Sequence, residues 1–405
     1  MKDVVLITTG SPATNPRLVK EADALSEAGH RVHVLYSHVV DWALPLDADI
    51  LRRAQWTATL IGGSPHQNRL THVLSSAAFR IIRNFRMSTS RSWWFSRTSP
   101  LLARAARSRR ADLYIAHNLG ALSAALSAAK HHGTLAAFDA EDYHSGEHPE
   151  GAEQRLTQEV ENRLIPQCDA AWAASPLIAQ AYGERFPQVD FTVIDNVFPP
   201  TLQPKWKELP ASPLRFVWFS QTIGPDRGLE PILTALASLP KGSWALTLVG
   251  RTSSDFQPTL DAIHRDHLGS VKIMAPIPEP DLFDILSSHH VGLATEMGVP
   301  ENRDLCRTNK LFSYILAGCH MAMTDTRAQV DFLKSFPGTG TLLPLQDTAC
   351  WAGILKGLMT DETQLEAGRH HNWTLGQHRL NWQEEKVKLL QRVDSLWASS
   401  NPAAG

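Results

Sequence analysis

The protein has 405 residues, more than one ordinary hydrophobic core supports, so two domains are expected. Hydrophobic residues make up 43% and charged residues 20%, a composition that is typical of a globular enzyme and excludes an intrinsically disordered chain. The formal net charge of −2 provides no global field that would attract nucleic acid, so no nucleic-acid partner is expected.

The cysteines and the apolar runs limit the cellular setting. The four cysteines are far apart and form no C-x-x-C pair, which argues against structural zinc or a disulfide framework and favours a reducing cytoplasm. No run of about 20 apolar residues occurs, so we expect no membrane-spanning helix. The first residues lead directly into an expected strand, so no cleaved signal is expected either.

The N-terminal half predicts alternating strands and helices. The apolar run 4–10 is typical of a buried parallel strand, and a helix is expected to begin at Asn15 and Pro16 and to end at Gly29. A parallel, right-handed crossover would then join the first strand to the second. The other expected elements are strands at 31–37, 111–118, 135–140, 170–175 and 191–196, and helices at about 120–132 and 151–167.

A proline-rich segment separates this half from a second β-α series. Residues 197–213 carry five prolines and no hydrophobic period, so we interpret them as an interdomain linker. After it we expect strands at 214–220, 244–250, 271–276, 291–295 and 320–325, helices near 228–239 and 309–317, and a closing helix.

This pattern predicts the fold class. It is α/β, with two doubly wound Rossmann-like domains facing a cleft. The predicted domains are an N-terminal acceptor-side domain at 1–200 and a C-terminal donor domain at 214–376. A C-terminal helix at about 377–397 can pack back on the first domain.

Ligands of such sheets bind at the carboxyl ends of the strands, and two ends in the second series carry basic residues. The loop in "SQTIGPDRGLEPIL" (220–233) places Arg227 just before a helix, where a guanidinium suits a departing diphosphate. "TNKLFSYILAG" (308–318) opens a helix on Thr308, Asn309 and Lys310, where free backbone N–H groups favour an anion. A solvated arginine and an ordinary capped helix remain the alternatives.

Two strand ends in the first series carry histidine and acids. His117 follows one strand and can contact a sugar hydroxyl, although a lone histidine is more often structural. "FDAEDYHSGEH" (138–148) follows another, and its Asp139, Glu141, Asp142 and His144 can hold acceptor hydroxyls, bind a divalent metal or form a solvated loop. The spacing singles out no metal site, so none is expected.

Other nucleotide-binding classes lack their motifs here. A nicotinamide dehydrogenase would show G-x-G-x-x-G after the first strand and an acid at the end of the second. This chain has "TGSPATNP" and "LYSH" at those places, and it has no P-loop.

At this point the segments resemble family 4 of the retaining glycosyltransferases, which have the GT-B fold. "NPRLVKEADALSEAGHRVHVL" is similar to the family's N-terminal unit, "FSQTIGPDRGLEPILTAL" to its basic Gly-rich loop, and "TNKLFSYILAGCHMAMTD" to its helix-opening segment. The resemblance implies transfer of a sugar from a nucleotide-diphosphate sugar to a glycan or lipid-linked acceptor, with retention and without a cofactor or metal. Polysaccharide biosynthesis at the cytoplasmic side of a membrane is the expected setting.

The resemblance also implies roles for individual residues. Arg227, Lys310 and His117 would be catalytic. The expected donor-binding residues are Gly10, Gln221, Thr222, Gly250, Arg251, Ile277, Glu301, Thr308, Asn309 and Leu311. The expected acceptor-side residues are Asn15, Asp139, Glu141, Asp142 and His144.

The chain departs from the family at two glutamates and in its basic loop. Leu305 and Ser313 stand where the family has the glutamates, so the ribose contact must come from elsewhere, such as Glu301, or be lost. In the loop, Gln221 replaces the family's arginine and Arg227 its lysine. The alternatives are therefore a nucleotide-sugar epimerase on the same fold, or a nucleotide-sugar-binding protein with impaired catalysis.

Residues 50–111 contain twelve arginines and no Asp, Glu or Lys. Around "VLSSAAFRIIRNF", apolar residues follow helical spacing with Arg80, Arg83 and Arg86 interleaved. Such a helix can lie on an anionic bilayer, which makes a peripheral membrane surface at 69–110 an expected partner. A core-packed helix with arginines that are solvated or paired to Glu147 and Glu150, or a groove for an anionic soluble acceptor, are the alternatives.

Overall fold

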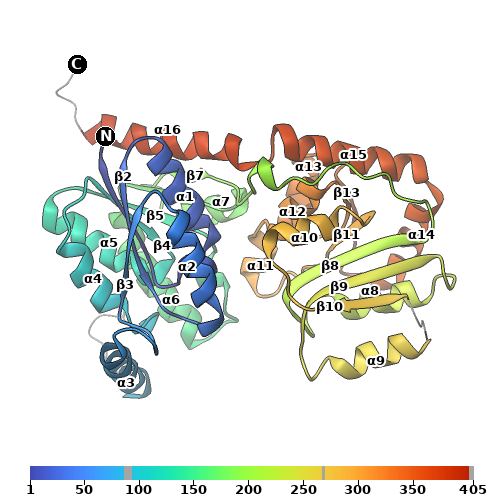
Figure 1. Ribbon diagram of the computed structural model, residues 1–405, viewed down its shortest axis with the longest axis horizontal. Helices are drawn as coiled ribbons and strands as arrows, with labels where there is room; N and C mark the ends of the chain where they lie inside the picture. Colours follow the sequence, from blue (N-terminus) through green and yellow to red (C-terminus); the bar gives the residue numbers. More distant parts are fainter. Residues whose placement is uncertain (86–93, 267–269, 401–405) are drawn as a thin grey trace. The chain divides into compact units, whose positions relative to one another are not determined.

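The computed structural model describes residues 1–85, 94–266 and 270–400, and the chain divides into two compact units. Unit 1 consists of Met1–Asp195 with the C-terminal residues from Lys386, and unit 2 consists of Asn196–Glu385. Each unit is built on one parallel sheet flanked by helices (Figure 1). The α/β class with two doubly wound domains, predicted from the sequence, is confirmed.

In the described part of unit 1, the sheet has seven strands in the order β3-β2-β1-β4-β5-β6-β7, and each neighbouring pair is parallel. The strands are β1 (Asp3–Thr8), β2 (Arg31–Ser37), β3 (Thr57–Ile61), β4 (Leu113–His117), β5 (Leu135–Ala140), β6 (Ala170–Ala173) and β7 (Phe191–Val193). The helices are α1 (Pro16–Glu27), α2 (Leu44–Arg53), α3 (Arg69–Phe85), α4 (Ser99–Arg107), α5 (Leu119–His132), α6 (Ala152–Leu164), α7 (Pro176–Arg185) and most of α16 (Trp382–Ser400). Figure 1 shows α1 on one side of the sheet and α4 and α5 on the other.

Local sequence explains where α1 begins and ends. The Asn15 side chain accepts a hydrogen bond from the backbone N–H of Leu18 at 3.0 Å, and Pro16 occupies the first helical position. Gly29 has a φ of +85°, and His30 donates its backbone N–H back to Leu25. The predicted cap and stop are therefore confirmed, and they fix the position of the first turn of α1 beside the ends of β1 and β4.

In the described part of unit 2, six parallel strands follow the order β10-β9-β8-β11-β12-β13. The strands are β8 (Leu214–Ile223), β9 (Trp244–Thr252), β10 (Val271–Met274), β11 (Val291–Ala294), β12 (His320–Thr324) and β13 (Gly340–Leu343). The helices are α8 (Leu229–Ala237), α9 (Gln257–Asp266), α10 (Glu279–Leu286), α11 (Glu301–Leu305), α12 (Asn309–Ala317), α13 (Arg327–Ser335), α14 (Trp351–Thr360) and α15 (Glu362–His378). The buried core contains Trp218, Trp244 and Trp351.

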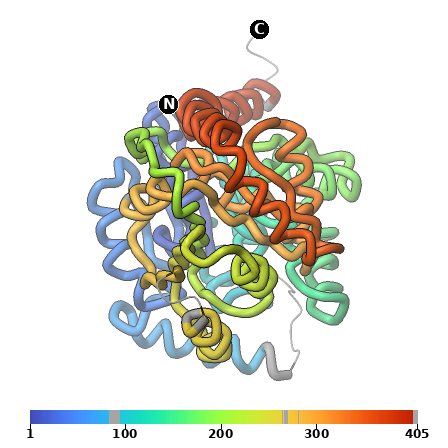
Figure 2. Tube along the Cα trace, turned by 90° about the vertical axis from the view of Figure 1, so that its right-hand side faces the viewer, coloured from blue at the N-terminus to red at the C-terminus, as the bar shows by residue number. Residues whose placement is uncertain are grey.

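The segment interpreted as a linker is attached to unit 2. Gln203 donates to the carbonyls of Leu316 and Trp373 at 3.2 and 2.7 Å, and the Arg369 guanidinium lies 4.8 Å from the centre of the Trp206 ring. Figures 1 and 2 show the segment (green) as an extended stretch over the surface of unit 2. Its prolines therefore do not mark a free linker, because backbone and aromatic contacts hold an extended chain that needs no helical or strand period.

No described helix combines the length and the apolar character needed to cross a bilayer.

Candidate functional site

The loop that carries Arg227 lies against the carboxyl end of β11. The hydroxyl of Thr295, the residue after β11, donates to the Arg227 carbonyl at 2.8 Å. Gly228 has a φ of +68°, and a Cβ at this position would lie 2.4 Å from the Thr295 carbonyl oxygen. Arg303 in α11 donates to the carbonyl of Asp226 at 3.1 Å. A glycine is thus required where the loop approaches the strand, and Arg227 is held at the edge of the sheet.

Lys310, in the first turn of α12, forms an ion pair that sequence reasoning missed. Its ammonium lies 2.6 Å from Glu296 Oε1 and 5.4 Å from the centre of the Trp218 ring. Burial alone would raise the pKa of Glu296, but the charges of Lys310, Arg303 and Arg227 hold that pKa below its usual value. The start of α12 and the loop that carries Arg227 therefore both contact the residues that follow β11. The only signal for Glu296 in the sequence is its position two residues after β11.

The start of α12 lacks the side-chain cap that the sequence predicts at Thr308. Thr308 occupies the N-cap position with extended backbone, but its side chain makes no capping hydrogen bond, and its Oγ1 is buried without a partner in the described chain. The Asn309 side chain is exposed and accepts a hydrogen bond from Asn196 at 2.9 Å. The first backbone N–H groups of α12 are therefore not occupied by the Thr308 side chain.

Four of the other predicted donor residues lie at the paired ends of β8 and β9. Gln221, Thr222 and Arg251 are exposed, and Thr222 is paired with Arg251 in register. A Cβ on Gly250 would lie 2.5 Å from the carbonyl oxygen of Ser220, so the two strands approach closely there.

Ile277 is half-buried beyond β10, and Glu301 is half exposed in α11, 3.7 Å from Arg327. Leu311 has no exposed surface, so its side chain does not reach a ligand in this structure.

Leu305 and Ser313, which stand at the glutamate positions of the resembled family, are also buried. The acid beside Lys310 therefore comes from the end of β11 and not from α12.

In unit 1, His117 lies at the centre of a buried charged cluster. It ends β4 and is paired in register with Asp139 of β5, while Arg17 and Glu21 reach it from α1. His117 Nε2 lies 3.2 Å from Glu21, and Nδ1 lies 3.2 Å from Asp139 and 3.0 Å from Glu141. Both ring nitrogens therefore face carboxylates, which favours the doubly protonated imidazolium.

Arg17 completes the charge balance of the cluster. Its Nε donates to Asp139 at 2.6 Å and its Nη1 donates to the Ile194 carbonyl at 2.7 Å. Trp172 of β6 donates its indole N–H to Glu21 at 3.0 Å. Sequence reasoning missed Arg17 and Glu21, because their i, i+4 spacing on α1 is that of an ordinary surface pair.

Burial and mutual attraction shift the titration of these groups in different directions. Burial disfavours the charged ring, but the surrounding Glu21, Asp139 and Glu141 raise the pKa of His117 well above its usual value. Burial, reinforced by the charge of Asp139, raises the pKa of Glu21 to about 7. Burial opposes ionisation of Asp139 too, but Arg17 and His117 lower its pKa below the usual range.

Glu21, His117 and Asp139 also present ligand atoms within 4.8 Å of one another. A divalent ion there would compete with Arg17, which already bonds Asp139, and with the protons that His117 directs at its carboxylates. The donor set thus fits an ion-paired cluster better than a metal site, and metal independence stays a prediction.

Of the predicted acceptor-side residues, Asn15 and Glu141 join this cluster at its edge. The Asn15 side chain donates to Glu141 at 2.6 Å, and the Glu141 side chain is 25% exposed, whereas His117 has no exposed surface. Gly10 lies nearby in sequence, and its carbonyl accepts from the backbone N–H of Ser37.

Asp142 and His144 belong to a different group. The buried His144 ring lies 2.9 Å from Glu147, and the Asp142 carbonyl accepts from Tyr182 at 3.4 Å. Burial disfavours protonation, but Glu147 raises the pKa of His144 to about 9. The structure therefore divides the predicted acceptor-side set into two groups.

No family model and no curated protein sequence match the chain, but solved structures do. HepE from Anabaena in complex with UDP superposes with a TM-score of 0.70 at 16% identity, over 98% of this chain and 100% of HepE. The chain has the GT-B fold. Two further structures have the same architecture. Sucrose-phosphate synthase from Thermosynechococcus elongatus superposes with a TM-score of 0.72 at 15% identity, over 98% of this chain and 100% of the synthase. WaaG, a glycosyltransferase involved in lipopolysaccharide biosynthesis, superposes with a TM-score of 0.62 at 10% identity, over 95% of this chain and 98% of WaaG.

Proposed function

We propose that this protein is a glycosyltransferase that transfers a sugar from a nucleotide-diphosphate sugar to an acceptor hydroxyl. The observation that carries the proposal is the Lys310–Glu296 ion pair at the carboxyl edge of the unit 2 sheet, beside Thr295, which bonds the loop that carries Arg227. Supporting it, the GT-B protein HepE has been solved with UDP-glucose. Unit 2 would bind the donor and unit 1 the acceptor.

The charges in unit 2 suit a diphosphate. Lys310, Arg303 and Arg227 favour the ionised carboxylate of Glu296, and their three positive charges exceed its single negative charge. The excess would oppose the two negative charges of the donor diphosphate and the third that develops as the bond to the sugar breaks. The first N–H groups of α12 add partial positive charge. These groups would stabilise the diphosphate as its bond to the sugar breaks, and Glu296 would orient the Lys310 ammonium.

A panel of nucleotide sugars, with and without glycan acceptors, tests this assignment. Arg227→Ala and Lys310→Ala should each lower turnover by about 10²–10³-fold, whereas Lys356→Ala, an exposed lysine on α14, should not. Near-normal transfer by both site variants would refute the site. Interconversion of free nucleotide sugars would favour the epimerase, and binding without turnover would favour a protein with lost chemistry.

The stereochemical outcome is a finer part of the proposal. The resemblance of the 220–233 and 308–318 segments to the retaining family supports retention. NMR of the first product formed should show the anomeric configuration of the donor. The opposite configuration would refute retention and leave the transferase assignment intact.

Glu141 is proposed to accept a hydrogen bond from the acceptor. It is the partly exposed member of the cluster, and Asn15 and His117 fix its carboxylate. Glu141→Gln should raise the KM for the acceptor and leave hydrolysis of the donor unchanged. Equal loss of both activities would contradict an acceptor role.

Helix α3 supports association with an anionic membrane, for which the cytoplasmic face is the proposed setting. Its Leu70, Val73, Leu74 and Ile81 are between 52% and 73% exposed and follow the helical period. They form an apolar stripe (Leu70, Val73, Leu74, Ala77, Ala78 and Ile81) that is exposed along α3, which is unusual for a water-soluble surface.

The arginines of this region extend the same proposal. Arg80 is exposed and forms no ion pair with Glu147 or Glu150 among the described side chains. The structure does not describe the Arg83 side chain, and Arg86 lies outside the described residues. The protein should sediment with anionic liposomes, less so in high salt, and less so after Arg80, Arg83 and Arg86 are changed to Ser. A protein that stays in the supernatant at low salt would refute the membrane proposal.

A further inference from the structure

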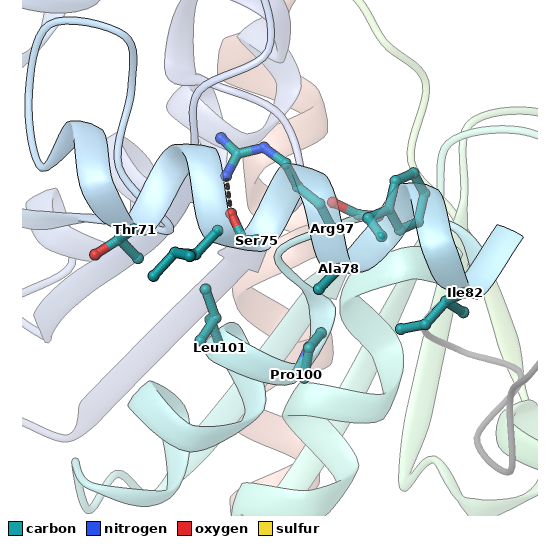
Figure 3. Close-up of a pocket in the computed structure, with 10 residues that line it drawn as sticks. Thr71, Ser75, Ala78, Ile82, Arg97, Pro100 and Leu101 are labelled. Carbon is teal, nitrogen blue, oxygen red and sulfur yellow. Dashed lines mark hydrogen bonds between the residues drawn. The ribbon is translucent and has the colours of Figure 1, made fainter.

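An apolar groove runs between α3 and α4 in unit 1. Leu74, Ala78 and Ile82 of α3 line one side, and Pro100 and Leu101 of α4 line the other, around a cavity of about 270 Å³ (Figure 3). The lining spans the helix from residue 71 to residue 82, which is about 16 Å at the helical rise of 1.5 Å per residue. The groove is therefore long enough along α3 to hold part of an extended chain.

Arg97 holds the groove open. Its Nη1 donates to the Gly62 carbonyl and to the Ser75 hydroxyl, both at 2.8 Å, and its Nη2 donates to the Gly63 carbonyl at 3.0 Å. These bonds join α3, the loop after β3 and the segment that leads into α4. The guanidinium is thus occupied by scaffold contacts, so the groove offers an occupant packing rather than a charged hydrogen bond.

The groove is continuous with the apolar stripe of α3. Leu74 and Ala78 belong to both, and Leu74 is 60% exposed. The exposed Arg69 and Arg80 stand near the two ends of α3, and the surrounding sequence from 50 to 111 contains no acid. A ligand with an aliphatic part and an anionic head would match both features.

We propose that this groove binds the aliphatic chain of an anionic bilayer lipid, with Arg69 and Arg80 of α3 at its headgroup. The inference rests on the membrane association proposed above. It adds that one acyl chain of the lipid lies between α3 and α4. The apolar stripe of α3 would then be inserted into the bilayer, and unit 1 would have a fixed orientation on the membrane surface.

Photolabelling of the full chain tests this. Phosphatidylglycerol vesicles with a diazirine in the acyl chain are irradiated with bound protein, and the labelled residues are mapped by mass spectrometry. Residues of α3 and α4 that line the groove should carry the label. Ala78→Trp, which fills the groove, should lower that label at least tenfold per bound protein. Ala77→Trp, on the adjacent exposed position of α3 outside the groove, should retain it.

Three results would overturn the inference. Label confined to Leu70, Val73 and Ile81 would show an inserted stripe with an empty groove, and undiminished groove label in Ala78→Trp would show that the chain does not occupy the cavity. Absence of vesicle binding would refute the membrane association as well. Sugar transfer to a soluble acceptor is measured in parallel without lipid. A protein that transfers no sugar in this assay would count against the glycosyltransferase assignment and not against the lipid groove.

Discussion

Glu21 makes the stability of unit 1 depend on pH. Burial raises the pKa of this carboxyl from its ordinary 4.5 to about 7 in the folded state. Between these two values the folded protein keeps the proton and the unfolded chain has lost it, so the free energy of unfolding must fall as pH rises. The contribution of Glu21 to the free energy of unfolding is fully present below pH 4.5 and is lost by about pH 7.

The size follows from the same numbers. At about 1.4 kcal/mol per pKa unit, the change from 4.5 to about 7 corresponds to about 3 kcal/mol. The raised pKa of His117 acts in the same direction above its usual value, and the lowered pKa of Asp139 acts below pH 3.8, where stability falls with acidification. Taken alone, these three cluster groups therefore make unit 1 most stable in mild acid, whereas the lowered pKa of the buried His33 acts in the opposite direction.

Glu21→Gln preserves the size of the side chain and removes its titration. The unfolding free energy of wild type minus that of Glu21→Gln should fall by about 3 kcal/mol between pH 4.5 and 7.5. Hydrogen exchange in urea, followed by mass spectrometry of peptides from β4 and β5, measures this locally, and β12 in unit 2 is the internal reference. Glu27→Gln, half-exposed on the same helix, is the control. A constant or rising difference would refute the reasoning, because it would mean that Glu21 is ionised and paired throughout.

Two further predictions concern unit 2 and metal dependence. Gly228→Ala should weaken binding of the nucleotide sugar identified in the panel at least tenfold in calorimetry, because the added Cβ would meet the Thr295 carbonyl and displace the loop. Gly242→Ala shares the positive φ but has no atom within 4 Å of the added Cβ, so it should bind normally, and equal loss in both variants would contradict the argument. Transfer should survive EDTA. Loss that manganese or magnesium restores would make the acids at 139–144 metal ligands.

The β-α rhythm could be predicted because buried parallel strands are continuous apolar runs between glycine and polar residues. Strands β2 and β5 and helix α12 have the bounds expected from 31–37, 135–140 and 309–317. The strand order could not be predicted, because β1 lies between β2 and β4, and the β1–β4 pairing joins residues about 109 positions apart. Short or half-exposed elements such as β3 and β13 were missed, because few of their residues are fully buried.

The candidate site was predictable only in part, for a different reason. Arg227 stood out as a cation in the loop before a helix, and Lys310 as a cation at the start of a helix. Arg17 and Glu21 have the i, i+4 spacing of an ordinary surface pair on a helix, and only the fold shows that both are buried against β4 and β5. Sequence periodicity reports which face of a helix is apolar, but it does not report a charged pair that is neutralised by a histidine from another element.

Glu296 supplies a carboxylate beside Lys310, but it does not supply the ribose contact expected of the missing helix acids. Leu305 and Ser313 are 3% and 1% exposed, so acids at these positions would have to lie inside unit 2 or force the helices apart. A carboxylate at the end of β11 reaches Lys310 without that cost, because the strand end is already at the edge of the sheet. The 2.6 Å ion pair keeps the ammonium oriented over Trp218 before any donor arrives. In the proposed donor site, a diphosphate would then share the ammonium with Glu296 while Arg227 and Arg303 supply further positive charge.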